Sequence, residues 1–224
     1  MTLGIIGGTS LLFSTLPPLE KKVIPTPYGQ VEVLCGDVNI LMRHQGNVPP
    51  HRINYCANLS ALALLGTDRI IAFGSSGSLK PEIRPGSIVL PDDYISMSEI
   101  PSIHDHAISH VMPCISQGLL HKLGKEFPDA RMGGVYVQTR GPRIETRAEV
   151  GVLSGFADIV GMTVASEATL ACELGIEFAA ICTVDNYANG LGAEVLSYEH
   201  ILATSREFAD RTARMVSTII KKIG

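Results

Sequence analysis

The segment FAAICTVDNYANG, residues 178–190, passes from an unbroken apolar run straight into polar side chains. A short apolar run that ends in turn residues is typical of a buried strand. Asp185 and Asn186 follow this run directly, and Gly190 closes the segment. In α/β sheets ligands bind beyond the carboxyl ends of strands, so this polar strand end predicts a ligand site.

Similar apolar runs, bounded by Gly, Pro or Asn, recur along the chain and predict further strands. They cover residues 3–8, 31–36, 38–43, 69–74, 86–91 and 133–139. Apolar residues at helical spacing predict helices in residues 51–66, 146–156, 166–175 and 196–224. Gly66 is expected to cap the first of these helices. This order, without an internal repeat or a low-complexity linker, predicts one α/β domain over residues 1–224, with a central mixed β-sheet flanked by helices.

The composition limits the classes of function. The chain has 224 residues, of which 46% are hydrophobic, and this is enough to bury one sizeable core. A net charge of −4, only 5% aromatic residues and the lack of a Lys/Arg run argue against nucleic-acid binding. No charged and then apolar leader precedes Gly4, and no apolar run reaches the roughly 18 residues of a membrane span. We therefore expect a soluble, cytoplasmic protein.

The cysteines are odd in number and widely scattered, and no two of them form a C-x-x-C pair. They are Cys35, Cys56, Cys114, Cys172 and Cys182. Most stand in apolar stretches, so this pattern predicts reduced thiols in the core of a cytosolic protein.

Several predicted strands end in groups that suit an oxyanion. The polar residues at these ends are Thr9 and Ser10, then Arg43 and His44, and then Ser75, Ser76 and Ser78. Glycines beside them let backbone N–H groups approach closely, hydroxyls donate hydrogen bonds, and an arginine offers a forked cation. Together these strand ends favour a phosphate site.

Each motif alone has a plainer explanation. GGTS is neither a dinucleotide fingerprint nor a Walker A sequence, and a tight turn explains it equally well. Arg43 and His44 are also explained by a strand-end salt bridge and a surface imidazole. A serine esterase built on Ser76 and His44 is a further alternative, but GSSGS lacks the G-x-S-x-G spacing because Ser78 replaces the second glycine.

Six motifs occur in order across nearly the whole chain: GIIGGTS, RHQGNVPPHRINYCAN, SSGSL, GPRIETRAE, GMTVASEATLACELGI and DNYANG. This set resembles the trimeric purine nucleoside phosphorylase family, and within it the S-methyl-5'-thioadenosine and S-methyl-5'-thioinosine phosphorylases. The resemblance implies a phosphorylase fold in which inorganic phosphate, the co-substrate, attacks C1' of a purine nucleoside. The products are then the free base and ribose 1-phosphate or its methylthio analogue. No other cofactor and no metal is expected, and a homotrimer or a dimer of trimers is implied.

The resemblance also assigns roles to individual residues. The positions that match phosphate contacts are Thr9, Arg43, His44, Ser75 and Thr163. The positions that match contacts to the nucleoside are Met162 under the ribose, Ile144 and Glu145 at the purine, and Asn186 at the imidazole side of the base. Tyr198 and Ile201 match positions that line the 5' pocket, and His110 resembles a histidine that the neighbouring subunit donates.

The chemistry of two of these residues favours a 6-oxopurine such as hypoxanthine or guanine. The Asn186 amide can donate to O6 and accept from a protonated N7, which also stabilises the leaving base, whereas an ionised carboxylate cannot donate. Glu145 can accept from N1–H, which a 6-oxopurine has and neutral adenine lacks. The plainer alternatives are an Asx-turn at Asn186, a helix-start acid at Glu145 and a core position for Met162.

Some residues depart from the family pattern. The segment RHQGNVPPH is short and lacks the usual second histidine, and Asp185 replaces a common Thr. Ile144 replaces a usual Phe, and Tyr198 stands where the methylthio branch has a small apolar residue, so the 5' preference stays open. These departures keep two alternatives in view: an S-methyl-5'-thioadenosine phosphorylase and a non-catalytic nucleoside-binding homologue.

Overall fold

The structure is a computed structural model. It describes residues 2–8, 11, 14, 16, 18–106, 108–192, 204 and 206–224. The predictions made for Thr9, Ser10, Tyr198 and Ile201, and for residues 196–203 of the last predicted helix, lie outside the described residues.

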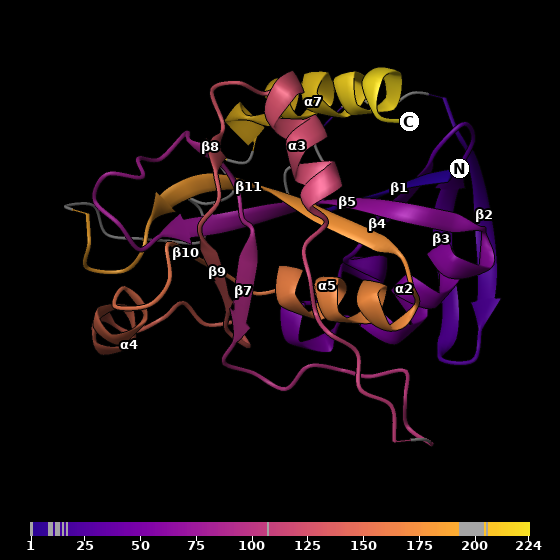
Figure 1. The fold of residues 1–224 in the computed structure, drawn as a ribbon, viewed down its shortest axis with the longest axis horizontal. Coiled ribbons are helices and arrows are strands. Elements are labelled where there is room, and N and C mark those ends of the chain that lie inside the picture. Colours follow the sequence, from indigo (N-terminus) through magenta and orange to yellow (C-terminus); the bar gives the residue numbers. More distant parts are fainter. Residues whose placement is uncertain are drawn as a thin grey trace.

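Runs of one to four strands are separated by helices along the described chain (Figure 1). The strands are β1 (Thr2–Gly7), β2 (Glu20–Thr26), β3 (Gly29–Cys35), β4 (Asn39–Met42), β5 (Thr67–Ser78), β6 (Ile88–Leu90), β7 (Asp93–Ser96), β8 (Arg131–Met132), β9 (Val135–Gln138), β10 (Ile159–Gly161) and β11 (Glu177–Tyr187). The α-helices are α2 (Tyr55–Leu64), α3 (Gln117–Glu126), α4 (Arg147–Leu153), α5 (Val164–Glu173) and α7 (Ala209–Lys222). Two short 3-10 turns, η1 (Gln45–Asn47) and η2 (Pro50–Arg52), lie between β4 and α2.

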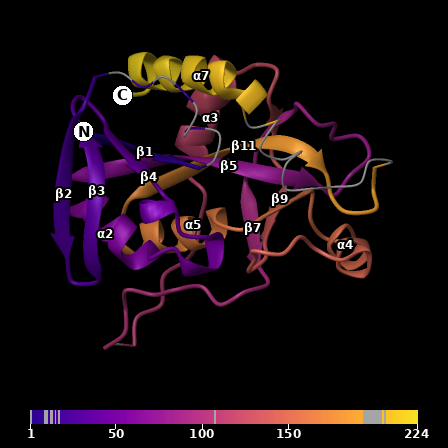
Figure 2. The same cartoon turned by 180° about the vertical axis from the view of Figure 1, so that it is seen from behind.

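The described strands form one 11-stranded mixed sheet, which confirms the predicted fold class. β5 is its central strand: β1 and β11 pair with it in parallel, and β10 pairs with it in the antiparallel sense. Figures 1 and 2 show α2 and α5 on one face of the sheet and α3 and α7 on the other. Because helices cover both faces, the central strands are buried, and Ile5, Ile71 and Ile181 are fully enclosed.

The longer apolar runs predicted the strands well. β1, β3, β4, β5, β6, β9 and β11 all fall on them, and Gly66 follows α2 with a positive φ of 72°, as expected of a helix C-terminus. The sequence reading missed β2, β7, β8, β10 and α3. β8 and β10 are only two and three residues long, too short to carry a periodic pattern.

β10 leads directly into α5, and a tyrosine from β9 holds this junction. The buried Tyr136 hydroxyl accepts hydrogen bonds from the backbone N–H of Thr163 at 3.2 Å and of Val164 at 3.4 Å. The Thr163 side chain makes no capping hydrogen bond, so Tyr136 performs the task that a capping side chain usually performs. Gly161 is required beside it, because a Cβ there would stand 2.2 Å from the Tyr136 hydroxyl oxygen.

We expect Tyr136→Phe to lower the free energy of unfolding by about 1–3 kcal/mol, because it leaves two buried backbone N–H groups without an acceptor. Urea unfolding measures this loss. Tyr187→Phe is the matched control, because the Tyr187 hydroxyl donates to the Pro81 carbonyl near the surface. Equal losses in the two variants would contradict the capping role.

Candidate active site

A gap opens along one edge of β5. β1 pairs with β5 only as far as Ala72, and β10 joins the same edge of β5 at Gly77. β1 runs parallel to β5 and β10 antiparallel, so the carboxyl ends of both strands point into the gap between them. The residues that follow these two ends, Gly8 and Thr163, therefore converge there. Such a point, where strand order and direction change, is where α/β sheets bind ligands.

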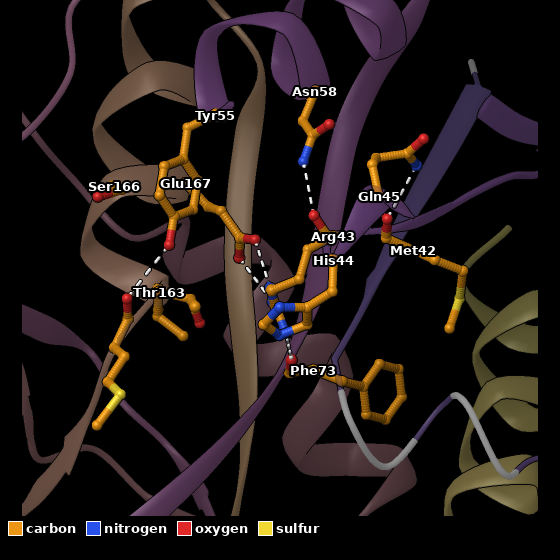
Figure 3. A network of polar contacts seen from close by, with 12 residues as sticks. Met42, Arg43, His44, Gln45, Tyr55, Asn58, Phe73, Thr163, Ser166 and Glu167 are labelled. Atoms are coloured by element: carbon orange, nitrogen blue, oxygen red, sulfur yellow. Dashed lines mark hydrogen bonds and ion pairs between the residues drawn. The ribbon is translucent and has the colours of Figure 1, made fainter. Parts of the chain in front are cut away.

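Arg43 fills the base of this gap (Figure 3). Its Nε and Nη2 donate to the two carboxylate oxygens of Glu167 at 2.7 and 2.8 Å, and its Nη1 donates to the Phe73 carbonyl at 2.7 Å. Arg43 is 2% exposed and Glu167 1%. Burial alone would lower the pKa of Arg43, but the adjacent Glu167 carboxylate more than offsets it and raises that pKa. The salt bridge offered as the plainer explanation of Arg43 is therefore present, but it is buried in the core.

The Arg43 guanidinium keeps hydrogen-bonding capacity. Of its five N–H donors, these contacts use three and leave one on Nη1 and one on Nη2. Nη1 lies directly against Gly8, where a Cβ would stand 2.3 Å from it. Only glycine at position 8 leaves room for the Arg43 cation.

His44 is half-buried, between the freely exposed imidazole considered from the sequence and a core position. Its Nδ1 lies 2.8 Å from the Val48 carbonyl and must carry the proton there, because a carbonyl oxygen only accepts. Burial first, and then the charge of Arg43, lower the pKa of His44, although the Val48 hydrogen bond acts in the opposite direction. A neutral imidazole of this tautomer presents Nε2 as an acceptor, which suits the hydroxyl of a hydrogen phosphate ion.

The side chain and the backbone N–H of Ser75 point in different directions. Its hydroxyl donates to the Asp185 carboxylate on β11. Alternate residues of a strand direct their backbone groups to the same side, and the Phe73 carbonyl faces Arg43. The Ser75 N–H therefore faces the gap, and we expect Ser75 to meet an anion there through its backbone.

Asp185 sits at a β-bulge. Val184 pairs with Ser76 and Asn186 with Gly77, so Asp185 is the extra residue. A bulge re-aims side chains, and Asp185 is buried, where it accepts from the Ser75 hydroxyl and, at 2.9 Å, from the Thr183 hydroxyl. Burial raises the pKa of Asp185 from its ordinary 3.8 to about 6, although both hydroxyls act to lower it.

Asn186 follows the bulge and is half-buried, with its Nδ2 donating to the Tyr187 carbonyl at 2.8 Å. The turn after it packs on the segment that holds Glu145. Asn189 donates to the Glu145 carbonyl at 2.9 Å, and Gly190 lies against the Arg147 side chain. The DNYANG and GPRIET motifs are therefore neighbours in space.

Glu145 is buried and accepts a hydrogen bond from the Thr139 hydroxyl. It does not start the next helix, because Thr146 and Glu149 form the capping box of α4. Ile144 beside it is half-buried, and the Met162 sulfur lies against Gly141, where a Cβ would stand 2.4 Å from it.

A hollow of about 450 Å³ lies beside Met162 and Thr139. Its other lining residues come mainly from the 3-10 turns, α2, α5 and the segment after β7, and they include His51, Tyr55, Met97, Arg140 and Ser166. This volume falls in the range of small-molecule sites.

His110 is exposed in the segment between β7 and α3.

The sequence did not predict a role for Glu167, and it did not predict where the side chain of Asp185 lies. Glu167 carried a usable signal, because it is an acid on the face of α5 formed by Val164, Ala168 and Ala171, all of them buried. Asp185 was noted as a departure, but only the bulge reveals that it turns toward Ser75. The Ser76 hydroxyl donates to the Thr183 carbonyl at 2.9 Å, which counts against a nucleophilic role.

Among the described residues, no group of three or more His, Cys, Asp or Glu side chains could hold a metal ion. No helix in the described ranges is long and apolar enough to cross a membrane.

Residues 2–221 match the family model of the Phosphorylase superfamily, and the chain belongs to this family. It is 40% identical to a probable 6-oxopurine nucleoside phosphorylase of Archaeoglobus fulgidus, over 99% of this chain and 96% of that protein. It is 33% identical to a probable S-methyl-5'-thioinosine phosphorylase of Methanocaldococcus jannaschii, over 97% of this chain and 91% of the relative. Among solved structures, the methylthioadenosine phosphorylase of Schistosoma mansoni in complex with adenine superposes with a TM-score of 0.87. At 23% identity, over 100% of this chain and 92% of that one, this likeness confirms the fold.

We expect Glu167→Gln to lower the free energy of unfolding by about 3–5 kcal/mol, because it leaves the buried Arg43 charge without a counter-ion. Urea unfolding with and without phosphate tests this, and phosphate should stabilise the variant more than the wild type. The control is Arg43→Met combined with Glu167→Gln, which removes both charges and should cost less than the single change. A loss under about 1 kcal/mol in the single variant would contradict the pairing.

We expect Asp185→Asn to change how stability depends on pH. The pKa of Asp185 is about 6 in the folded state and 3.8 ordinarily, so the wild type loses stability as the pH rises from about 4 to about 6. Below this range both states are protonated and nothing is lost; above it both are ionised and the loss is complete. A shift of about two pKa units corresponds to roughly 3 kcal/mol. Relative to the wild type, the variant should therefore gain up to that amount between acidic and mildly alkaline pH in urea unfolding. A stability difference that does not vary with pH would rule out this account of Asp185.

Proposed function

We propose that the chain is a purine nucleoside phosphorylase that acts on 6-oxopurine nucleosides, with inorganic phosphate as the second substrate. The observation that carries this proposal is the gap between β1 and β10. There the buried Arg43, two of whose N–H donors are unpaired among the described residues, meets Gly8, the Ser75 N–H and the start of α5. The names of the curated relatives agree with this activity.

In this proposal phosphate binds in the gap and attacks C1' of the nucleoside. Arg43 donates to it through the N–H groups that Glu167 and Phe73 leave unused, Ser75 donates through its backbone, and His44 accepts the phosphate hydroxyl. Thr163 offers its hydroxyl at the N-terminus of α5, where the helix dipole favours an anion. The buried ion pair costs no reorganisation when charge develops, which is the condition for electrostatic catalysis.

The new bond joins a phosphate oxygen to C1', and the bond from C1' to the purine nitrogen breaks. The electron pair of the broken bond stays on the base. A proton from solvent binds N7 and neutralises this charge. The Asn186 carbonyl accepts a hydrogen bond from that N7–H while its amide group donates to O6, and Glu145 accepts from N1–H. Met162 packs under the ribose. Apart from that proton, every step uses groups of the chain and of phosphate alone.

The 5' substituent is the finer part of the proposal. The relatives include both 6-oxopurine nucleoside and S-methyl-5'-thioinosine phosphorylases, so inosine, guanosine and S-methyl-5'-thioinosine are the substrates to compare. We propose a homotrimer, as the family resemblance implies. Ile108 and Met112, which are 95% and 86% exposed in the segment that carries His110, suit residues that a neighbouring subunit covers. We also propose a cytoplasmic location and purine salvage as the setting.

The test is phosphate-dependent release of base from S-methyl-5'-thioinosine, inosine, guanosine and S-methyl-5'-thioadenosine, measured in parallel by chromatography. We expect release of hypoxanthine or guanine, and little or no release of adenine. Binding without turnover of any substrate would instead favour the non-catalytic homologue. Release of adenine alone would favour a methylthioadenosine phosphorylase.

We expect Asn186→Asp to shift kcat/KM from 6-oxopurine toward 6-aminopurine nucleosides by about tenfold or more, because the amide donor becomes an acceptor. Asn54→Asp is the matched control, since Asn54 is exposed and its amide donates to the Tyr28 carbonyl rather than to any group placed at the base. An unchanged ratio of kcat/KM for inosine and adenosine would refute the role of Asn186.

A further inference from the structure

Two cysteines meet outside the phosphate site. The Sγ atoms of Cys114 and Cys172 lie 3.8 Å apart, although 58 residues separate them in the chain. Cys114 is exposed and lies in the irregular segment before α3, and Cys172 is half-buried in the last turn of α5. The prediction that the cysteines are core residues is therefore wrong for this pair, and holds for Cys35 and Cys182.

The segment between β7 and α3 is already fastened to the same end of α5 at a second point. Glu173 accepts from the Ser102 hydroxyl at 2.8 Å and from the Ile103 N–H at 2.7 Å. The described chain between these two anchors, residues 104–106 and 108–113, forms an arm that runs past α5 in Figures 1 and 2. The start of the same segment, from Met97 to Pro101, lines the hollow beside Met162.

We propose that Cys114 and Cys172 form a disulfide under oxidising conditions and that this bond closes the arm onto α5. The oxidant is a peroxide. One thiolate attacks a peroxide oxygen and becomes a sulfenic acid, which the second thiol attacks to expel water. In sum, two thiols and one hydrogen peroxide give one disulfide and two waters, with two electrons passing from sulfur to oxygen.

The geometry suits this reaction without movement of the core. A disulfide needs the sulfur atoms about 2.0 Å apart, so they must approach by roughly 1.8 Å. Cys114 lies in an irregular and exposed segment that can supply this shift, whereas Cys172 is fixed on a helix.

The reaction should be slow at neutral pH and faster in mild alkali. The hydrogen bond with the Cys172 thiol, together with partial burial, raises the pKa of the Cys114 thiol above its ordinary 9.0. Only the thiolate reacts, and below the pKa its fraction rises tenfold for each pH unit. We therefore expect the disulfide between Cys114 and Cys172 to form only on sustained exposure to oxidant.

The experiment uses the reduced full chain, treated with hydrogen peroxide at neutral pH and one pH unit higher, then alkylated and mapped by mass spectrometry. We expect the loss of two hydrogens, a linked peptide that holds Cys114 and Cys172, and formation about tenfold faster at the higher pH. Cys114→Ser and Cys172→Ser should each abolish the linked peptide. Cys56→Ser is the matched control that should keep it, because Cys56 lies against the same segment, with its thiol 3.6 Å from the Ser102 carbonyl.

Thermal unfolding gives a second readout. The oxidised wild type should melt higher by about 4 °C or more, whereas the melting temperature of the Cys114→Ser variant should not change on oxidation. Oxidation of Cys114 to sulfinic or sulfonic acid alone would overturn the proposal. Disulfides formed only between chains, or no reaction at either pH, would overturn it as well.

Discussion

The buried ion pair between Arg43 and Glu167 is the interaction on which the rest of the site depends. Arg43 follows β4, Glu167 lies in α5, and the Phe73 carbonyl of β5 takes a third guanidinium bond. One side chain thus ties together three elements that are far apart in the sequence. Because both charges are enclosed, the pair is stable only in this bidentate geometry, and that requirement fixes the start of α5 against the sheet.

The pair also sets the electrostatics of the gap. Arg43 and Glu167 cancel in net charge, and Asp185 adds a buried carboxyl on the neighbouring strand. Directed hydrogen bonds and the N-terminus of α5 would therefore supply most of the binding free energy of an anion there, and net positive charge would supply little. Such a site favours a ligand whose oxygens match the donors in position, as phosphate does.

The sequence was informative where local pattern controls structure. Long apolar runs located the central strands, and the positions of Arg43 and Asn186 at strand ends located the edge of the sheet where the candidate site lies. Contacts between residues far apart in the chain could not be predicted in the same way. No local sequence pattern indicates that Glu167 faces Arg43 or that a bulge turns Asp185 toward Ser75, because both contacts depend on how distant strands pair.

The cysteines illustrate the same limit. Most of the cysteines stand in apolar stretches, which predicted core positions, yet Cys114 is exposed in the irregular segment before α3. Glu173 of α5 binds the start of that segment at Ser102 and Ile103, and no periodic pattern in the sequence encodes such contacts.

A crystal structure of the chain with phosphate and hypoxanthine would test the central claim most directly. The account predicts phosphate in the gap, within hydrogen-bonding distance of the unused N–H groups of Arg43 and of the Ser75 backbone, while Arg43 stays paired with Glu167. It also predicts the base between Glu145 and Asn186. Phosphate bound elsewhere, or an Arg43 that leaves Glu167 to reach it, would contradict the account.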